Sequence, residues 1–186
     1  MTAPTFDPAI HPSKLDGTIR TITGKKFNLF EPTPDMIDIQ DIATGLANKG
    51  HFSGFSPKYF SIAEHCIMVC DEFALWNDSQ PDSMKLLALL HDAPEAYIGD
   101  MVKPLKIHMP DYIAVENRIM KVIAERFNLD LSLMHLIKPT DLLIQNIEYN
   151  AFFHGGQIAM NQTVSYLDPD TAKAVFIDRF NEYYHE

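Results

Sequence analysis

The stretch Met84–Asp100 reads MKLLALLHDAPEAYIGD, and its first half is the most apolar run of helical character in the chain. Leucines cover more than one side of this segment, so the pattern predicts a buried helix over Met84–Ala96 at the centre of a domain. His91 and Asp92 follow the leucines directly. Burying both side chains in such surroundings costs free energy unless they are paired or bind a metal ion.

Helical spacing and capping residues predict the elements on both sides of this central helix. A helix opened by Thr33-Pro34 runs to Leu46, and others cover Ser61–Trp76, Tyr112–Phe127, Leu131–Lys138, Asp141–Phe153 and the stretch after Asp168-Pro169. Residues Ile19–Phe30 predict a short hairpin around Gly24, Met1–Gly17 an irregular arm, and Gly155-Gly156 a break. We therefore expect an all-α fold: a single domain over residues 1–186, built as a bundle of six or seven helices.

Composition narrows the class of protein. The 186 residues carry a formal net charge of −10, which argues against polymeric nucleic acid as a partner but allows a small anionic ligand in a locally positive cleft. No apolar run is long enough for a membrane span, and Met1–Ile10 lacks the pattern of a signal peptide. The two cysteines, Cys66 and Cys70, suggest core residues of one helix rather than a disulfide framework. We expect a cytoplasmic protein without a membrane partner.

Two further residues share the character of the His91-Asp92 pair. His65 lies in the apolar helix Ser61–Trp76, and Asp141 precedes the apolar run Leu142–Ile144. Taken singly, a buried histidine is more often a hydrogen-bonded core residue, and an aspartate after Pro-Thr is more often a helix cap. Together, two imidazoles and two carboxylates on three helices can converge in the core of a bundle and bind a divalent metal. Such a mixed set suits Mn²⁺, Fe²⁺, Co²⁺, Ni²⁺ or Zn²⁺, and Mg²⁺ stays open.

Charged residues continue beyond Asp92. Glu95 follows His91 by one expected helical turn, and Asp100 comes just after Gly99. Lys103 and Lys106 follow at a spacing that places them on one side of a helix. The two lysines have an alternative interpretation as solvated surface residues. Metal ligands, two further carboxylates and two lysines therefore lie within the sixteen residues His91–Lys106.

At this point the sequence resembles a known family. His65, His91-Asp92 and Asp141 match the H…HD…D pattern of the HD-domain phosphohydrolases. The segment 59–66, YFSIAEHC, resembles the "YSVAEH" of one subgroup, 91–100 resembles its "HDAAEAYIGD", and 140–148 resembles its "ADLxLLxxE" helix. The resemblance covers Ile19–Phe153. The subgroup contains bacterial HD-domain 5′-nucleotidases and, more similar still, phage dATP triphosphohydrolases.

The resemblance implies roles for residues near the proposed metal. Glu95 and Asp100 match catalytic carboxylates: Glu95 would activate a water, and Asp100 would protonate the leaving 5′-oxygen or orient a water that does. The segment 50–55 matches a loop that faces the sugar and base, although this chain has His51 and Phe55 where relatives have Arg and His. The expected substrate contacts are His51, Phe52, Lys58, Lys103, Pro104 and Lys106.

The expected reaction releases the nucleoside from a 5′-phosphate or 5′-triphosphate, with dAMP or dATP as the first choice of substrate. Two alternatives stay open: a phosphodiesterase of the same fold, and a non-catalytic helical module in which the metal is structural. The resemblance also implies a bacterial cytoplasmic protein, encoded by a cell or a phage, that forms a homo-oligomer, either a dimer or a hexamer. The last helix, with Phe176, Phe180, Tyr183 and Tyr184, is a candidate oligomer face unless it packs against the core.

Overall fold

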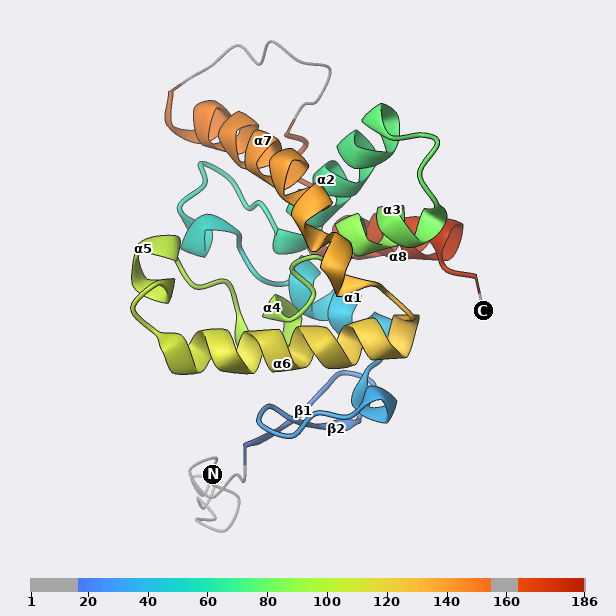
Figure 1. Ribbon diagram of the computed structural model, residues 1–186. Coiled ribbons are helices and arrows are strands. Elements are labelled where there is room, and N and C mark those ends of the chain that lie inside the picture. Colours follow the sequence, from blue (N-terminus) through green and yellow to red (C-terminus); the bar gives the residue numbers. More distant parts are fainter. Residues whose placement is uncertain (1–16, 155–163, 186) are drawn as a thin grey trace, which may run out of the picture.

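The computed structural model describes residues 17–154 and 164–185. This described part folds into eight α-helices and one two-stranded antiparallel sheet (Figure 1), so the all-α class is confirmed. The strands are β1 (Thr18–Arg20) and β2 (Lys26–Asn28). The helices are α1 (Ile39–Ala47), α2 (Ile62–Trp76), α3 (Asp82–Leu89), α4 (Glu95–Ile98), α5 (Lys103–Lys106), α6 (Pro110–Phe127), α7 (Met134–Phe153) and α8 (Pro169–Tyr183).

The helix count exceeds the six or seven expected from the sequence because α4 and α5 are single turns, too short for apolar periodicity to reveal. Short 3-10 turns cover Pro34–Met36, Phe52–Gly54 and Leu131–Leu133. The expected arm over Met1–Gly17 lies outside the described residues except for Gly17, and the expected break at Gly155-Gly156 lies outside them entirely. No helix of the described part is long and apolar enough to cross a membrane.

The core has two parts that meet at α2. On one side of α2 lie α1, α3 and α8, with side chains such as Leu46, Leu89 and Phe176 fully or almost fully buried. On the other side α7 packs against α2 and α3. Eleven of the fifteen positions of α2 are buried, because this helix is covered on both sides. Cys66 and Cys70 are free, buried core residues of α2, as predicted.

The last helix packs within the chain. Phe176 and Phe180 of α8 are buried, and Tyr184 lies against Phe127 and Phe180. These aromatic side chains therefore complete the core, which is the alternative that the sequence left open for them. A homo-oligomer stays a prediction, but this aromatic face is not free to form its contact.

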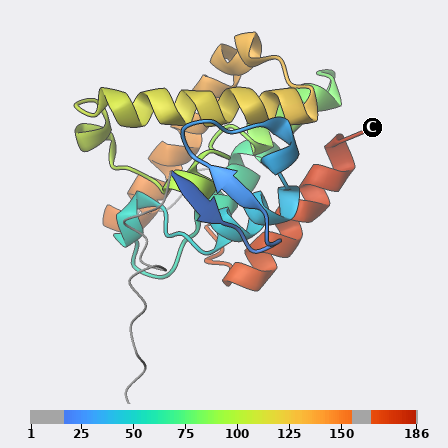
Figure 2. The ribbon, with the colours of Figure 1, turned by 90° about the horizontal axis from the view of Figure 1, so that it is seen from below.

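The predicted hairpin is confirmed, and it supports α4. Strand residue Phe27 is fully buried and stacks on Tyr97 of α4 with ring centroids 3.9 Å apart. Asp41 in the first turn of α1 accepts hydrogen bonds from the backbone and hydroxyl of Thr23 in the turn between the strands. Seen from below, the hairpin lies across the end of the bundle (Figure 2).

The helix starts predicted at Ser61 and Asp168 are right, and the one predicted at Thr33 is wrong. Ser61 caps α2 by accepting from the backbone N–H of Glu64, and Asp168 caps α8. Thr33 does not cap a long helix: Pro34 opens only a 3-10 turn, which ends because Ile37 is extended at φ −79°, ψ 134°. The helix begins after Asp38, whose carboxylate accepts from the backbone N–H of Gln40.

The leucine-rich helix is shorter than predicted. It ends at Leu89 rather than Ala96, and the chain continues through consecutive turns into α4. Pro94 explains the difference, since it has no N–H to give and restricts the residue before it to non-helical conformations. His91 and Asp92 therefore lie on a tight turn, and the expected one-turn helical spacing between His91 and Glu95 is wrong.

Helix α7 is longer than predicted. The segments Leu131–Lys138 and Asp141–Phe153 were expected as separate helices, but one helix runs from Met134 to Phe153 with Pro139 inside it. Pro139 lies in the second turn, where its missing N–H removes one backbone hydrogen bond without ending the helix. Asp141 is consequently an interior residue of α7 and does not cap it.

Candidate metal centre

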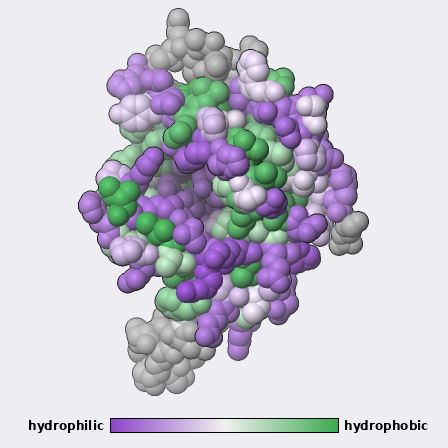
Figure 3. Space-filling model, in the orientation of Figure 1, coloured by the Kyte–Doolittle hydropathy of each residue, from purple (hydrophilic) through white to green (hydrophobic). Residues whose placement is uncertain are grey.

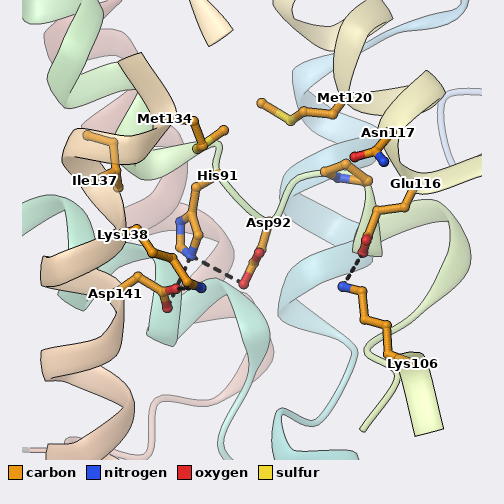
Figure 4. A pocket seen from close by; sticks show the side chains of 11 residues that line it. His91, Asp92, Lys106, Glu116, Asn117, Met120, Met134, Ile137, Lys138 and Asp141 are labelled. Carbon is orange, nitrogen blue, oxygen red and sulfur yellow. Dashed lines mark hydrogen bonds and ion pairs between the residues drawn. The ribbon is translucent and has the colours of Figure 1, made fainter. Parts of the chain in front are cut away.

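The four predicted metal ligands meet, although they come from three separate parts of the fold. His65 lies in the first turns of α2, His91 and Asp92 on the turn after α3, and Asp141 in α7. Nε2 of His65 lies 3.3 Å from Oδ1 of Asp141 and 3.8 Å from Oδ2 of Asp92. Nε2 of His91 lies 3.7 Å and 3.2 Å from the same two oxygens. Figure 4 shows His91, Asp92 and Asp141 pointing toward one another.

The Nδ1 atoms of His65 and His91 already have hydrogen-bond partners. Nδ1 of His65 lies 2.8 Å from Oε1 of Glu148, and Nδ1 of His91 lies 2.8 Å from the carbonyl oxygen of Ala88. A carbonyl oxygen only accepts, so Nδ1 of His91 carries the hydrogen and Nε2 presents its lone pair. Both Nε2 atoms are buried and have no hydrogen-bond partner among the described residues.

These orphaned lone pairs fit a cation. A buried polar atom without a partner is costly, and two such nitrogens aimed at two carboxylates are satisfied at once by a divalent metal. His65, His91 and Asp141 can each offer a ligand atom, and the three atoms lie within 4.8 Å of one another. A carboxylate that fixes the other nitrogen of a ligating histidine, as Glu148 does, is the usual support of such a site.

The electrostatics of the cluster favour positive charge. Burial alone would lower the pKa of His91, but Asp92 and Asp141 beside it raise that pKa well above its usual value. Burial alone would likewise raise the pKa of Asp141, yet its interactions with His65 and His91 hold that pKa far below the usual value. The cluster therefore attracts either protons or a metal ion, and the two compete for the same nitrogens.

A cleft opens in front of the metal centre. It consists of two adjoining cavities of about 350 and 570 Å³. The residues that line both are Asp92, Lys106, Glu116, Lys138 and Asp141. In the space-filling view the hollow is surrounded mainly by hydrophilic side chains (Figure 3). The carboxylates of the metal centre thus lie where the two cavities meet.

Most of the other predicted site residues line the larger cavity. They are Glu95, Asp100, His51, Phe52, Lys103, Pro104 and Lys106. Lys58 lines neither cavity: its Nζ lies over the ring of Tyr166, 5.5 Å from the centroid. The predicted substrate contact of Lys58 is therefore not supported, because the loop directs this lysine away from the cleft.

Glu95 is the first residue of α4, which packs closely against α1. A Cβ on Gly45 would lie 2.7 Å from the carbonyl oxygen of Ala96, so glycine lets α1 approach α4 this closely. Glu95 is 4% exposed, and its Oε1 lies 3.8 Å from Nζ of Lys106. Burial, followed by the charge of Asp92, raises the pKa of Glu95 well above its usual value. A carboxylate of this kind is an unusually strong base.

Asp100 is paired with a histidine. Its Oδ2 lies 3.3 Å from Nδ1 of His51, whose Nε2 lies 3.6 Å from Oε2 of Glu148. Burial opposes charge on both partners, but the pairing prevails: it lowers the pKa of Asp100 and raises that of His51 to about 9. His51 is only 8% exposed, and its two ring nitrogens face two carboxylates at the edge of the cavity that it lines.

Four residues at the site were missed as site residues by sequence reasoning. Glu148 lies two helical turns after Asp141 on an apolar helix, which is a signal that was available. Lys138 and Gln145 both donate to Asp141, the latter over 2.7 Å from its Nε2 to Oδ1. Glu116 of α6 lies 2.6 Å from Nζ of Lys106. For Glu116 nothing in the sequence pattern points to the cleft.

Comparison with known proteins places the chain in a family. It is 31% identical to the uncharacterized protein YfdR of Escherichia coli K12 over 174 residues, which cover 88% of this chain and 94% of that protein. It is also 37% identical over 122 residues to an uncharacterized protein of Rhodobacter capsulatus, covering 64% of this chain and 62% of that protein's length. No family model matches the chain. The chain therefore belongs to the same family as YfdR, and the activity has to be argued from the site.

Proposed function

We propose that this protein is a divalent-metal-dependent phosphohydrolase of the HD-domain type that releases the nucleoside from 5′-nucleotides. The observation that carries the proposal is the pair of buried, unpartnered Nε2 atoms of His65 and His91, aimed at two carboxylates where two cavities join. A metal held only for structure needs no cleft, whereas this centre borders one that Glu95 and Asp100 also line.

His65, His91, Asp92 and Asp141 would hold the cation, which is Mn²⁺, Fe²⁺, Co²⁺, Ni²⁺, Zn²⁺ or Mg²⁺ on the chemistry of these ligands. When bound there, such a cation neutralises phosphoryl oxygens and lowers the pKa of a water beside them. Gln145 and Lys138 keep Asp141 in place through its two oxygens. Glu148 and the carbonyl oxygen of Ala88 keep the two imidazoles oriented.

Glu95 and Asp100 take part in the two proton transfers of the proposed reaction. The raised pKa of Glu95 suits this carboxylate to accept a proton from the attacking water. The bond between the α-phosphorus and O5′ breaks, and O5′ leaves with a proton. Because the pair with His51 favours ionised Asp100, we propose that Asp100 orients the water that supplies this proton. If Asp100 instead donated the proton directly, its carboxyl group would have to be protonated, and the pair with His51 disfavours that state.

The cleft also offers cations and an aromatic ring. Lys106 is partly engaged by Glu116 and Glu95, and Lys103 lines the same cavity. Both can stabilise negative charge on a phosphate. Phe52 is half-buried and lies edge-on against His51, with ring centroids 4.6 Å apart. We propose that Phe52 contacts the base or sugar, and that dAMP or dATP is the substrate, as the resemblance implies.

A product assay tests the proposal. The purified protein is incubated with Mn²⁺, Co²⁺ or Mg²⁺ and a panel of deoxynucleoside and ribonucleoside mono- and triphosphates and cyclic nucleotides, and the products are identified. Release of nucleoside together with phosphate or triphosphate is expected. Absence of nucleoside from every substrate would show that the protein is not this hydrolase, and turnover of cyclic nucleotides alone would make it a phosphodiesterase.

Two substitutions separate the metal centre from the catalytic carboxylate. Asp92→Ala should remove both bound metal and turnover, measured by elemental analysis and by nucleoside release. Glu95→Ala should keep the metal and lose turnover by about 10²-fold or more. Asp78→Ala, on the exposed loop before α3, is the matched control and should change neither. Metal retained by Asp92→Ala would remove Asp92 from the ligand set.

A further inference from the structure

We infer that His51 is a positioning residue that links the cleft carboxylate Asp100 to the metal centre through Glu148. The inference rests on the proposed function for its kinetic test but not for its geometry. It differs from the substrate contact that the sequence suggested, because the structure directs both ring nitrogens of His51 at protein carboxylates.

The backbone of His51 is anchored beside the start of α2. The N–H of His51 donates to the carbonyl of Phe60 over 2.8 Å, and Gly50 forms a bridge with Ser61 at the base of the same loop. The loop is thus closed where α2 begins. The His51 ring stacks on His65 of α2 with centroids 4.5 Å apart and an interplanar angle of 26°. Phe52 and Phe60 flank the ring.

Four side chains then form one continuous series. Asp100 faces Nδ1 of His51 at 3.3 Å, Nε2 of His51 faces Oε2 of Glu148 at 3.6 Å, and Oε1 of Glu148 lies 2.8 Å from Nδ1 of His65. Both nitrogens of His51 and Oε2 of Glu148 are buried and have no well-directed hydrogen bond to any described residue. The ring therefore lies between two carboxylates, one that lines the cleft and one that supports His65.

The same loop holds Asp100 a second time. The backbone of Ser53 lies beside the Asp100 carboxylate and helps to lower its pKa, and Ser53 has the left-handed φ of 52°. Asp100 itself follows Gly99, whose φ is 83°, so its own backbone turns sharply just before it. The loop 51–54 therefore sets where the Asp100 oxygens lie in the cleft, and His51 connects that position to the support of His65.

A double-mutant cycle tests the link. Turnover of dAMP or dATP with Mn²⁺ is measured for wild type, His51→Gln, Asp100→Asn and the double variant. His51→Gln should lower kcat about tenfold with little change in KM, and Asp100→Asn about 10²-fold. Because His51 acts through Asp100, the double variant should fall within about twofold of Asp100→Asn alone. His185→Gln, which removes a histidine–aspartate pair on the exposed surface, is the control and should leave kcat unchanged.

If the double variant instead loses about 10³-fold in kcat, the product of the two single losses, His51 and Asp100 act independently and the link is wrong. The proposal that the protein hydrolyses nucleotides would not be affected by that result. If His51→Gln does not fold, His51→Asn takes its place in the same cycle. Calorimetric titration of the metal-stripped His51→Gln variant with Zn²⁺ gives a readout without turnover. A weaker metal affinity than that of wild type is expected, and an unchanged affinity would refute the link to His65 even if no nucleotide were hydrolysed.

Discussion

Replacing Glu148 by glutamine is the most informative single change outside the ligand set. The Glu148 side chain is fully buried in α7, and its Oε1 lies 2.8 Å from Nδ1 of His65. Glutamine keeps the length of the side chain and an oxygen that can accept the same hydrogen. The negative charge is removed, and an amide NH2 replaces the oxygen that faces Nε2 of His51, so the change measures how much the Glu148 carboxylate contributes to metal binding through His65.

The expected size follows from the bond that is weakened. A hydrogen bond to a charged group contributes about 1.5–3 kcal/mol and a neutral one about 0.5–1.5 kcal/mol. The difference of about 1–1.5 kcal/mol corresponds to roughly a tenfold weaker metal affinity. This value lies at the lower edge of the roughly 10–100-fold loss typical when the carboxylate support of a metal ligand is changed.

Calorimetric titration of metal-stripped protein with Mn²⁺ and with Zn²⁺ measures the dissociation constants directly. Glu125→Gln, on the exposed face of α6, carries the same change of charge and should bind both metals like wild type. A Glu148→Gln variant that is folded, as judged by circular dichroism, yet binds metal as tightly as wild type would refute the support assigned to Glu148.

Three further changes probe the fold around the site. Glu64→Gln should lower the free energy of unfolding in urea by about 2–4 kcal/mol, because Glu64 accepts three backbone N–H groups of residues 165–167 over 2.8, 2.9 and 2.8 Å; an unchanged midpoint and slope would contradict this. Gly45→Ala should lower the melting temperature, at a cost of about 1–3 kcal/mol, because its Cβ would lie 2.7 Å from the oxygen of Ala96. In metal-free protein the pKa of His51 is raised from 6.5 to about 9, so its pairs stabilise the fold fully below pH 6.5 and this stabilisation is lost as the pH rises through 9. Urea titrations between pH 6.5 and 9 should show this decrease in the free energy of unfolding, and the decrease should be smaller in His51→Gln. An equal decrease in the variant would exclude His51 as the cause.

Local features of the fold were predictable where one short segment contains the whole cause. Ser61 and Asp168 cap their helices with their own side chains, and both starts were correctly predicted. The errors arose where two local signals compete. Pro94 overrides the leucine periodicity and ends α3 early, whereas α7 continues through Pro139. The apolar periodicity alone does not show whether a proline ends a helix or is accommodated by the packing around it.

The sequence by itself determined the chemical character of the site: two imidazoles and several carboxylates in apolar segments that must be paired or bind a cation. Only the tertiary structure decided which atoms face one another. Glu148 and His65 are separated by 83 positions in the chain, yet they form a buried hydrogen bond that directs Nε2 of His65 toward the metal centre. The same packing of α2 against α7 joins His51 to Glu148, a contact between a loop and a helix that no spacing encodes. Burial raises the energetic cost of each unpaired group, so the long-range packing of the helices sets the orientation and protonation of these residues.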